Sequence, residues 1–483
     1  MKKKETTIIN YISYSPLGVG VIPSATPVIA IFDIGKTNKK LFLFNEQYQI
    51  VFEQQQPFEE IVDEDGFACE DVIALSNWIK QSLKQIITMP DITLKAINFS
   101  TYGASFVYLN NSGNIIAPLY NYLKPFSETL KNQFFSKYGG EKWFTVSTAS
   151  PMLGNLNSGL QLYRIKYEKP DLFNQIKYAL HLPQYLCYLV TGRFFSDITS
   201  IGCHTGLWNF SEYRYHDWVF QEGINEKLAP IYPSNQLMQI NINIKGLLCG
   251  TGLHDSSAAL IPYLANVSEP FILISTGTWC ISLNPFNNKT LTVQELQQDC
   301  LCYMEYSGKP VKASRLFAGY EHEQQTKRLA AYFNVDKNYY KTVAFNAAII
   351  KTLNEKCVDS NTNEVMMQQS LFVDRNLEDF IDYEEAYHQL IINLVNQQVV
   401  STNLVIQKNS TKKLFVDGGF SKNPIYMNLL ANAYPNIEVY ASKIAQATAI
   451  GAAMAVHKQW NSYELPTDII QLKKYYFYKN ILI

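Results

Sequence analysis

The stretch VIAIFDIGKTNKKLFLF, residues 28–44, decides the fold of the first half of the chain. Residues 28–32 and 41–44 are apolar runs suited to buried strands. The polar residues between the runs include Gly35, so the stretch predicts a β-hairpin with a polar turn, as expected at the start of an α/β domain. The elements expected next are a strand at 50–54, a helix at 72–87 and a strand at 94–99.

The second half of the chain repeats this opening. The stretch FILISTGTWCISL, residues 271–283, predicts two strands joined by a polar turn at 275–278. The stretch LFVDGGFSKN, residues 414–423, predicts a strand that ends at two glycines. Two similar α/β halves indicate an internal duplication, with a boundary near Lys245. If the halves face each other, both polar turns line one cleft. The later elements expected are a helix at 423–433, a strand at 437–440 and an Ala-rich helix at 445–456.

The composition limits the partners that the chain can have. Its 483 residues suggest two or three domains, and 47% hydrophobic with 17% charged residues suits a globular protein with a large core. The formal net charge is -1 and no long basic run occurs, which argues against binding to nucleic acid. The sequence contains no apolar run of 18 residues, so we expect no membrane span. A small-molecule ligand is the better expectation.

Cysteine usage and the N-terminus predict a cytoplasmic protein. The eight cysteines include no CxxC pair, and the segment Cys300–Cys302 has no nearby histidine to suggest a zinc site. Scattered cysteines in a long chain are typical of buried free thiols in a reducing compartment. Residues 1–27 are expected to be a loose extension, because polar residues and Pro16 interrupt their apolar stretch and disfavour a secretory signal.

The turn of the first hairpin carries the residue types that a nucleotide phosphate site needs. Asp33 can supply a carboxylate for Mg²⁺, and Gly35 lets the backbone approach a phosphate closely. Lys36, Thr37 and Asn38 can add polar contacts. An ordinary hairpin turn also favours Asp, Gly and Asn, so this turn alone leaves both interpretations open. The matching polar turn in the second half favours phosphate binding.

His254 and Asp255 stand close to the predicted boundary between the halves. A kinase that phosphorylates an alcohol needs a carboxylate to accept the hydroxyl proton and orient the oxygen for in-line attack. Asp255 suits that role, whereas a helix-capping Asp with His254 packed beside it is the simpler structural interpretation. A short helical segment is expected at 258–261, running into Pro262.

Three other features also have plain structural explanations. The segment Asp417–Asn423 ends a strand and opens a helix, which suits a nucleotide on bare backbone or a purely structural Gly-Gly turn. The segment Thr101–Ser105 can face a sugar or simply leave a strand. The cluster Glu321–Glu323 can bind a metal or form a solvated helix face, and is left unassigned.

Taken in order, these segments resemble the FGGY carbohydrate kinases, within the wider actin and hexokinase-like superfamily. No single motif is very specific, but their order matches the family pattern over nearly the whole chain after residue 27. The segments that carry the resemblance are DIGKTN at 33–38, STYG at 100–103, HLP at 181–183, LVTG at 189–192, DIT at 197–199, GLHD at 252–255, STGTW at 275–279, DGG at 417–419 and QATAIGAA at 446–453.

The resemblance implies a fold, cofactors and a site. It implies an α/β protein of two actin-like (ribonuclease H-like) domains, residues 28–245 for sugar binding and 246–483 for ATP binding, with ATP and the sugar in a central cleft. ATP and Mg²⁺ are the implied cofactors, and a monomer or homodimer is expected. The implied site residues are Asp255 as catalytic base, His254, Tyr102 and Gly103 at the sugar, Asp33 at the metal, and Gly35, Lys36, Thr37, Asn38, Thr276, Gly277, Thr278, Gly418, Gly419, Ser421 and Asn423 at the nucleotide.

The substrate is less closely defined. The segments at 252–256 and 275–279 look closer to the rhamnulokinase and fuculokinase branches than to glycerol kinases, which usually carry Gly-Asp-Gln at the base. The turn at 33–38 is also similar to the opening turn of fuculokinases. The resemblance therefore favours a ketose such as a 6-deoxy-ketohexose, L-rhamnulose or L-fuculose, phosphorylated at its 1-hydroxyl. The pentuloses xylulose and ribulose stay open as alternatives.

The sequence also departs from the family. Lys36 replaces a small residue in the first phosphate turn, where it can strengthen ATP binding or crowd the γ-phosphate. The family's Arg-Ala-x-x-Glu-Gly helix is not apparent, and residues 387–392 stand in its place. A catalytically silent sugar- or nucleotide-binding protein on the same fold is the main alternative, since fold does not fix function. Retention of Asp33 and Asp255 argues for an active enzyme.

Overall fold

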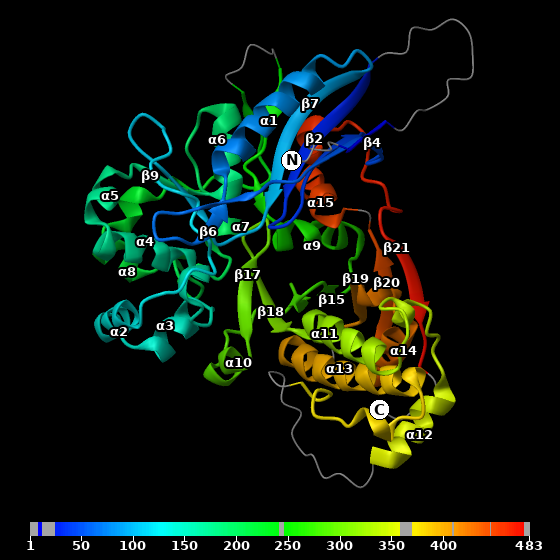
Figure 1. The fold of residues 1–483 in the computed structure, drawn as a ribbon. Coiled ribbons are helices and arrows are strands. Elements are labelled where there is room, and N and C mark those ends of the chain that lie inside the picture. Colours follow the sequence, from blue (N-terminus) through cyan, green and yellow to red (C-terminus); the bar gives the residue numbers. More distant parts are fainter. Residues whose placement is uncertain are drawn as a thin grey trace, which may run out of the picture. The chain divides into compact units, whose positions relative to one another are not determined.

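The computed structural model describes residues 8–11, 25–240, 246–357, 370–407, 410–444 and 446–477 (Figure 1). The chain divides into two compact units, the first made of residues 1–265, 302–310 and 445–469 and the second of residues 266–301, 311–444 and 470–483. The predicted boundary near Lys245 and most of the predicted extension at 1–27 lie outside the described residues. No helix in the described ranges is long and apolar enough to cross a membrane.

The first unit is built on a mixed sheet with strand order β1-β4-β3-β2-β7-β13-β12, and β14 also pairs with β7. The predicted hairpin is formed by β2 (Thr26–Ile34) and β3 (Lys39–Asn45), and the predicted third strand is β4 (Ile50–Gln56). β7 (Ile92–Thr101) runs parallel to β2, and β14 (Leu253–His254) runs parallel to β7. The hairpin that the sequence predicted is therefore confirmed.

The sheet of the second unit follows the same plan, with the order β18-β16-β15-β19-β20-β21. β15 (Phe271–Thr276) and β16 (Cys280–Asn284) form an antiparallel hairpin. β19 (Lys413–Gly418) lies parallel to β15, and β20 (Glu438–Lys443) lies parallel to β19. In the first unit β3, β2, β7 and β13 follow the same succession of one antiparallel and two parallel pairings. This shared pattern supports the predicted duplication.

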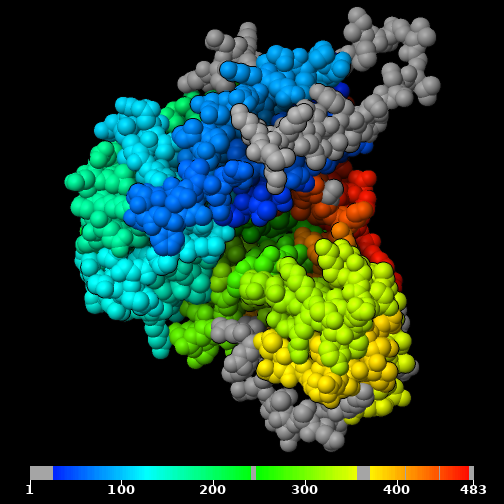
Figure 2. Space-filling model, in the orientation of Figure 1, coloured from blue at the N-terminus to red at the C-terminus, as the bar shows by residue number. Residues whose placement is uncertain are grey.

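Each unit buries its strands under helices. Residues 28–32 of β2 are completely buried, and α1 (Val72–Ile87) places Leu75, Ile79 and Leu83 in the same core. In the second unit α13 (Tyr383–Val405) packs beside α11 and α14 (Figure 1). Figure 2 shows residues of α11, coloured yellow-green, at the surface of the second unit. Seven cysteines in the described ranges are buried free thiols, as the sequence predicted.

The helix that begins at Asp255 is longer than the sequence predicted. A short segment ending at Pro262 was expected, but α9 runs from Asp255 to Asn266 and contains Pro262. A proline has no N–H to donate, so the carbonyl of Ala258 loses its helical partner. Gly451 of α15 packs directly on that carbonyl, and a Cβ at position 451 would lie 1.8 Å from the Ala258 oxygen. This close contact fixes α15 against α9, and with it the start of α9.

The elements of the two units have the following bounds. The first unit contains β1 Ile8–Tyr11, β2 Thr26–Ile34, β3 Lys39–Asn45, β4 Ile50–Gln56, β5 Glu60–Val62, β6 Ala68–Glu70, α1 Val72–Ile87, β7 Ile92–Thr101, β8 Phe106–Leu109, α2 Glu128–Lys137, α3 Glu141–Ser147, α4 Ser158–Glu168, α5 Pro170–Gln175, β9 Tyr178–His181, α6 Leu182–Thr191, α7 Ile198–Ile201, β10 Trp208–Asn209, β11 Arg214–Tyr215, α8 Asp217–Gln221, β12 Met238–Gln239, β13 Leu248–Cys249, β14 Leu253–His254, α9 Asp255–Asn266, α15 Ala447–Ala455 and α16 His457–Trp460. The remaining elements are β15 Phe271–Thr276, β16 Cys280–Asn284, α10 Val293–Gln297, β17 Cys300–Met304, β18 Pro310–Leu316, α11 Ala318–Tyr332, α12 Ala347–Cys357, α13 Tyr383–Val405, β19 Lys413–Gly418, α14 Pro424–Ala433, β20 Glu438–Lys443 and β21 Gln471–Tyr475.

Candidate active site

The ends of three parallel strands bring two predicted site residues together in the first unit. β2 and β14 both pair with β7 in parallel, so their carboxyl ends meet at one edge of the sheet. Asp33 is paired with Ser100, and His254 is paired with Thr101. Asp255 follows as the first residue of α9. The structure thus places Asp33 and Asp255, which are far apart in sequence, near each other.

The Asp33 carboxylate is half-buried and held from α15. The Thr448 hydroxyl donates a hydrogen bond to Oδ2 of Asp33 at 2.7 Å. Loss of hydration on burial raises the pKa of Asp33 to about 6, and the negative charge of Asp255 adds to this rise, while Thr448 and Lys40 lower it. At neutral pH the group is an anion whose charge the protein compensates incompletely, which suits a cation ligand.

The Asp255 carboxylate stands on the first residue of α9 and has a raised pKa. It accepts hydrogen bonds from the N–H of Ser256 at 2.6 Å and from the Ser256 hydroxyl at 3.3 Å. Burial raises the pKa of Asp255 to about 6 against these two bonds, even though 34% of the side chain is accessible to solvent. Such a carboxylate is ionised at neutral pH and more basic than an ordinary Asp, as a general base requires.

Two buried amides hold the glycine turn that leads into the base. Oδ1 of Asn98 accepts a hydrogen bond from the N–H of Gly252 at 3.1 Å. Nε2 of Gln184 donates to the Gly252 carbonyl at 2.9 Å. Gly252 has a φ of 74°, a left-handed conformation that favours glycine. Asn98 and Gln184 could not be predicted from the sequence, because a single amide in an apolar strand or helix belongs to no motif.

A buried carboxylate supports His254 from α7. The N–H of His254 donates to the Thr199 hydroxyl oxygen at 3.0 Å, and the N–H of Thr199 donates to Asp197 at 2.8 Å. The Ser234 hydroxyl donates to the other oxygen of Asp197 at 2.5 Å. Burial raises the pKa of Asp197 to about 6 in spite of these bonds. The DIT segment therefore positions the backbone of His254.

The predicted sugar-pocket residues Tyr102 and Gly103 lie beside His254. A Cβ at position 103 would lie 2.6 Å from Cδ2 of His254, so only glycine leaves room for the imidazole in this position. Tyr102 is 8% exposed, and its hydroxyl donates to Glu70, which also pairs with Lys39 at 2.8 Å. Because its hydroxyl is occupied, Tyr102 can offer mainly its ring. Contact of these residues with a sugar stays a prediction.

The turn between β2 and β3 is a tight, exposed connection. The N–H of Gly35 donates to the Asn38 carbonyl at 2.8 Å, and Thr37 and Asn38 are exposed. Lys36 pairs with Glu60 at 3.0 Å, and the two side chains are 28% and 49% exposed. Surface ion pairs of this kind contribute little free energy, so Lys36 can exchange Glu60 for a phosphate. Its predicted contact with the nucleotide remains a prediction.

In the second unit two further predicted turns lie side by side, because Thr276 of β15 is paired with Gly418 of β19. The Thr276 hydroxyl donates to the Asp417 carbonyl and accepts from the N–H of Phe420 at 3.0 Å. The N–H of Gly419 donates to the Thr276 carbonyl at 3.0 Å. Gly418 has a φ of 79°, and a Cβ there would lie 1.9 Å from the Thr276 oxygen. The turn requires glycine for both reasons.

A cavity of about 670 Å³ lies against these turns within the second unit. Ser421 does not line it, and its hydroxyl donates to the Gly418 carbonyl at 2.8 Å. The predicted residues that line the cavity are Thr276, Gly277, Thr278, Gly419 and Asn423. Lining residues that the sequence did not predict include His322, Tyr340, Tyr387 and Phe420.

Three of the lining side chains form a hydrogen-bonded relay. Nδ2 of Asn423 donates to the Tyr387 hydroxyl oxygen at 2.8 Å, and this oxygen lies 3.0 Å from Nε2 of His322. The arrangement that satisfies all three groups has Tyr387 donating to Nε2, with the proton of a neutral His322 on Nδ1. Burial lowers the pKa of His322 to about 4, in agreement with a neutral ring.

The relay explains two segments that the sequence left unassigned or unexplained. Tyr387 begins the segment 387–392, which stands where the family pattern has another helix motif. The Glu321–Glu323 cluster is a solvated helix face only in part. Glu323 pairs with Lys327 at 2.6 Å on the surface, but both His322 and Glu323 line the cavity. Pattern reasoning missed His322 because helical spacing alone does not tell which neighbour covers a helix face.

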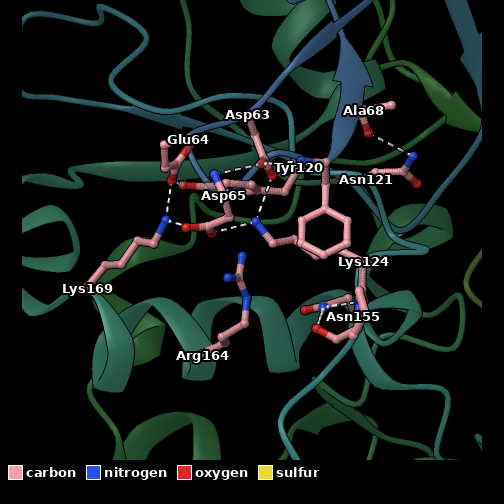
Figure 3. A network of polar contacts seen from close by, with 12 residues as sticks. Asp63, Glu64, Asp65, Ala68, Tyr120, Asn121, Lys124, Asn155, Arg164 and Lys169 are labelled. Carbon is pink, nitrogen blue, oxygen red and sulfur yellow. Dashed lines mark hydrogen bonds and ion pairs between the residues drawn. The ribbon is translucent and has the colours of Figure 1, made fainter.

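A network of ion pairs anchors the segment 119–125 in the first unit (Figure 3). Lys124 pairs with Asp63 at 2.7 Å and with Asp65 at 2.6 Å, and its own side chain is buried. Lys169 pairs with Asp65 at 3.0 Å. Figure 3 shows Arg164 reaching up from α4, and its guanidinium lies 4.9 Å from the centre of the Tyr120 ring.

The anchored segment carries Tyr122, a second residue that the sequence did not single out. Its ring is half-buried and lies 6.2 Å from the ring of Tyr102. Burial raises the pKa of Tyr122, and the negative charge of Asp255 adds to the rise. Tyr122 therefore belongs to the surroundings of Asp255 and is a candidate for substrate contact.

Two family profiles together match most of the chain. The profile described as FGGY family of carbohydrate kinases, N-terminal domain, matches residues 28–261. The profile described as carbohydrate kinase FGGY, C-terminal domain, matches residues 268–463. The first range contains Asp33 and Asp255, and the second contains both glycine turns and the aromatic cavity.

Among curated proteins, the chain is 24% identical over 263 residues to a rhamnulokinase of Halalkalibacterium halodurans. The alignment covers 52% of this chain and 54% of that protein. It is 27% identical over 168 residues to a rhamnulokinase of Mannheimia succiniciproducens, and this alignment covers 34% of each chain. The chain thus spans about half, or less, of the length of these curated relatives.

The structure is similar to that of a carbohydrate kinase from Novosphingobium aromaticivorans, with 20% identity, a TM-score of 0.76 and coverage of 94% of this chain and 95% of that one. It is also similar to a ligand-bound xylulose kinase from Lactobacillus acidophilus, with 16% identity, a TM-score of 0.75 and coverage of 94% of each chain. At these identities the likeness concerns the fold. It confirms the predicted α/β architecture of two actin-like domains.

Proposed function

The chain belongs to the FGGY family of carbohydrate kinases, and on that basis we propose that it transfers the γ-phosphate of ATP to a hydroxyl group of a ketose. The observation that carries the proposal is the pair of carboxylates Asp33, near the end of β2, and Asp255, directly after β14, each with a pKa raised to about 6. Phosphoryl transfer to an alcohol needs one carboxylate to receive the hydroxyl proton and another to hold a cation near the phosphates.

In this proposal Asp255 performs the proton transfer. Its carboxylate accepts a hydrogen bond from the attacking sugar hydroxyl, orients the oxygen for in-line attack and takes the proton as the new O–P bond forms. The backbone of His254 is held by Thr199, and its ring occupies the space that Gly103 leaves open. We propose that His254 contacts the sugar next to Asp255. Because the backbone N–H of Ser256 donates a hydrogen bond to the carboxylate, Asp255 is held in place before the substrate arrives.

Asp33 fits a Mg²⁺ ligand, because a half-buried and incompletely compensated carboxylate is the kind of oxygen donor that this ion accepts. Mg²⁺ keeps several waters and is typically held by one or two carboxylates together with the phosphates, so a single carboxylate is sufficient. A bound Mg²⁺ would neutralise charge on the phosphates. The residues proposed to contact the phosphates are those of the turns at 35–38 and 276–278.

The aromatic cavity of the second unit is the proposed nucleoside site. The residues that line it include Gly277 and Gly419, which expose backbone without a side chain, and aromatic side chains on which a base can stack. Replacement of Tyr387 by Phe breaks the relay between Asn423 and His322, and the loss of about one hydrogen bond should raise the KM for ATP roughly 3- to 10-fold with little change in kcat. Steady-state kinetics at varied ATP measures both parameters.

Tyr383→Phe provides the matched control for this prediction. Tyr383 lies one turn earlier on α13, and its hydroxyl has no hydrogen-bond partner among the residues that the structure describes. Its removal should leave the KM for ATP unchanged. Equal KM values in the two variants and the wild type would exclude the relay from nucleotide binding.

The pH dependence of kcat/KM follows from Asp255. The base acts as the ionised carboxylate, and burial raises its pKa to about 6, so activity should be constant above pH 7 and fall as the pH drops below 6. At pH 5 the expected loss is about tenfold from this group alone. Saturating Mg²⁺ should remove the contribution of Asp33, because the cation competes with its proton. A profile that stays level down to pH 4.5 would contradict this assignment.

For the sugar, the proposal is a 6-deoxy-ketohexose such as L-rhamnulose or L-fuculose, supported by the rhamnulokinases among the relatives. Xylulose kinases among the similar structures support a pentulose as the second candidate. Mg²⁺-dependent release of ADP, measured against L-rhamnulose, L-fuculose, D- and L-xylulose, D- and L-ribulose and glycerol, distinguishes the two classes. Turnover with one ketose supports the proposal, and no turnover with any member, while ATP still binds, would favour the silent binding protein.

The cytoplasmic location, the monomeric or dimeric state and the cleft between the two domains stay predictions from the sequence and the resemblance.

A further inference from the structure

One thiol and two imidazoles converge next to the proposed base. The ligand atoms of Cys203, His204 and His254 all lie within 4.8 Å of one another, and Sγ of Cys203 is 3.1 Å from Nε2 of His254. The three residues are 1%, 7% and 4% exposed. Within the described ranges of the chain, this is the one group of three or more His, Cys, Asp or Glu side chains that converges in this way.

We propose that Cys203, His204 and His254 form a binding site for a thiophilic divalent cation such as Zn²⁺, and that its occupation inhibits the enzyme. The binding itself is independent of the proposed function, whereas the inhibition rests on the kinase activity proposed above.

The outer ring nitrogen of His204 is held as in protein metal sites. A histidine that binds a metal through one nitrogen commonly donates its other N–H to a carboxylate or a backbone carbonyl. Nδ1 of His204 lies 3.2 Å from the Leu156 carbonyl oxygen, so it carries the donated proton. Nδ1 of His254 has no hydrogen-bond partner among the described residues, and it is Nε2 of this ring that faces Sγ of Cys203, at 3.1 Å. In both rings the nitrogen that a metal would take is therefore Nε2.

The donor set selects the class of ion. One thiolate and two neutral imidazoles suit Zn²⁺ and similar cations, whereas Mg²⁺ and Ca²⁺ require oxygen ligands. Tetrahedral zinc with ordinary bond lengths separates a sulfur and a nitrogen ligand by about 3.6 Å. Closing around an ion therefore requires Cys203 and His254 to part by only about half an ångström.

The surrounding packing holds the three side chains in place before any ion binds. Gly103 leaves the imidazole of His254 its space, and the ring of Tyr303 lies 5.7 Å from His254 and 6.0 Å from His204. His204 has a φ of 40°, a left-handed conformation that is costly for a non-glycine residue. Costly backbone conformations are concentrated at functional sites, and this one aims His204 at the cluster.

Occupation affects the proposed chemistry through His254. An ion releases the thiol proton of Cys203 to solvent and fixes the His254 ring, which is then withdrawn from the sugar. Three protein ligands leave a fourth position for water, as in zinc sites that are open to solvent.

The test uses the full chain, reduced and freed of metal, and titrates it with Co²⁺ in the absence of catalytic substrates. Co²⁺ reports a thiolate ligand by a charge-transfer band in the near ultraviolet and a four-coordinate site by its visible absorption. We expect both signals to saturate at one equivalent and Zn²⁺ to displace the Co²⁺. Cys203→Ser should abolish the charge-transfer band and weaken Zn²⁺ binding at least about tenfold.

Two other variants complete the design. Cys69→Ser, which alters a buried thiol elsewhere in the first unit, should retain the band. His204→Asn removes the imidazole with a residue that tolerates the left-handed backbone, and it should weaken Zn²⁺ binding as Cys203→Ser does. Thermal melting of each variant establishes that it is folded.

Each outcome bears on the proposal. No charge-transfer band in the wild type, or a band unaffected by Cys203→Ser, would refute the site whether or not the protein is a kinase. If the site binds Zn²⁺ and the wild-type kinase is inhibited while Cys203→Ser is resistant, both parts are supported. If Zn²⁺ binds stoichiometrically without slowing turnover, the inhibitory part is wrong.

Discussion

Replacing Asp255 by Asn is expected to lower kcat by about 10²- to 10⁴-fold, the range that general-base catalysis contributes. Asparagine keeps the shape of the side chain and the hydrogen bonds from Ser256, but it cannot accept a proton from the sugar hydroxyl. The KM values for ATP and the sugar should therefore change little. Steady-state kinetics and equilibrium binding of ATP measure the two effects separately.

The same variant should not lose stability. Burial raises the pKa of Asp255 above its ordinary value of 3.8 to about 6. Between these two values the folded protein binds the proton more tightly than the unfolded chain, so this group's contribution to stability falls as the pH rises through that window. An uncharged residue removes the effect, and the Tm of Asp255→Asn at pH 7.5 should equal or exceed that of the wild type.

Asp217→Asn is the matched control for Asp255→Asn. Asp217 is also the first residue of a helix in the first unit, but it is exposed and pairs with Arg214 at 2.6 Å. The variant Asp217→Asn should retain wild-type kcat. Wild-type turnover by Asp255→Asn would remove Asp255 as the base, and a large loss of Tm would indicate that the residue is structural instead.

The second large effect is expected at Asp33. Replacing Asp33 by Asn removes the charge proposed to hold Mg²⁺, and we expect kcat to fall by about 10²-fold or more. The Mg²⁺ concentration for half-maximal activity should rise at the same time, while the KM for the sugar stays nearly constant. Asparagine can still accept the hydrogen bond from Thr448, so the packing of α15 is preserved.

A metal titration of activity distinguishes this role from a structural one. Asp91→Asn alters an exposed carboxylate just before β7 and should leave the Mg²⁺ dependence unchanged. If Asp33→Asn lowered kcat with an unaltered Mg²⁺ dependence, the carboxylate would act on the reaction by some means other than cation binding.

The strands and turns of the fold could be predicted because their signals are local. The apolar runs at 28–32 and 271–274 are buried strands, and the polar turns that follow them lie where the sequence placed them. The extension of α9 through Pro262 could not be predicted. Pro262 leaves one carbonyl of α9 without its helical partner, and the residue that packs on this carbonyl, Gly451, lies far along the chain.

The candidate site also contains residues that the sequence could predict and residues that it could not. Asp33 lies near the end of a strand and Asp255 directly follows one, and both belong to recognisable segments, so the sequence predicted both. The relay of His322, Tyr387 and Asn423 joins three helical regions, and none of its members stands in a motif for that role. The cluster around Cys203 was missed because its members lack the short spacing of zinc motifs and converge only in the folded chain.

The most direct test of the central claim is to follow, by ³¹P NMR, the γ-phosphate of ATP with wild-type protein, Mg²⁺ and the ketose that turns over best. We expect a phosphate monoester on the sugar's 1-oxygen that appears as ATP disappears, and almost none with Asp255→Asn at equal protein concentration. Inorganic phosphate in place of the ester, or equal ester formation by Asp255→Asn, would contradict the claim.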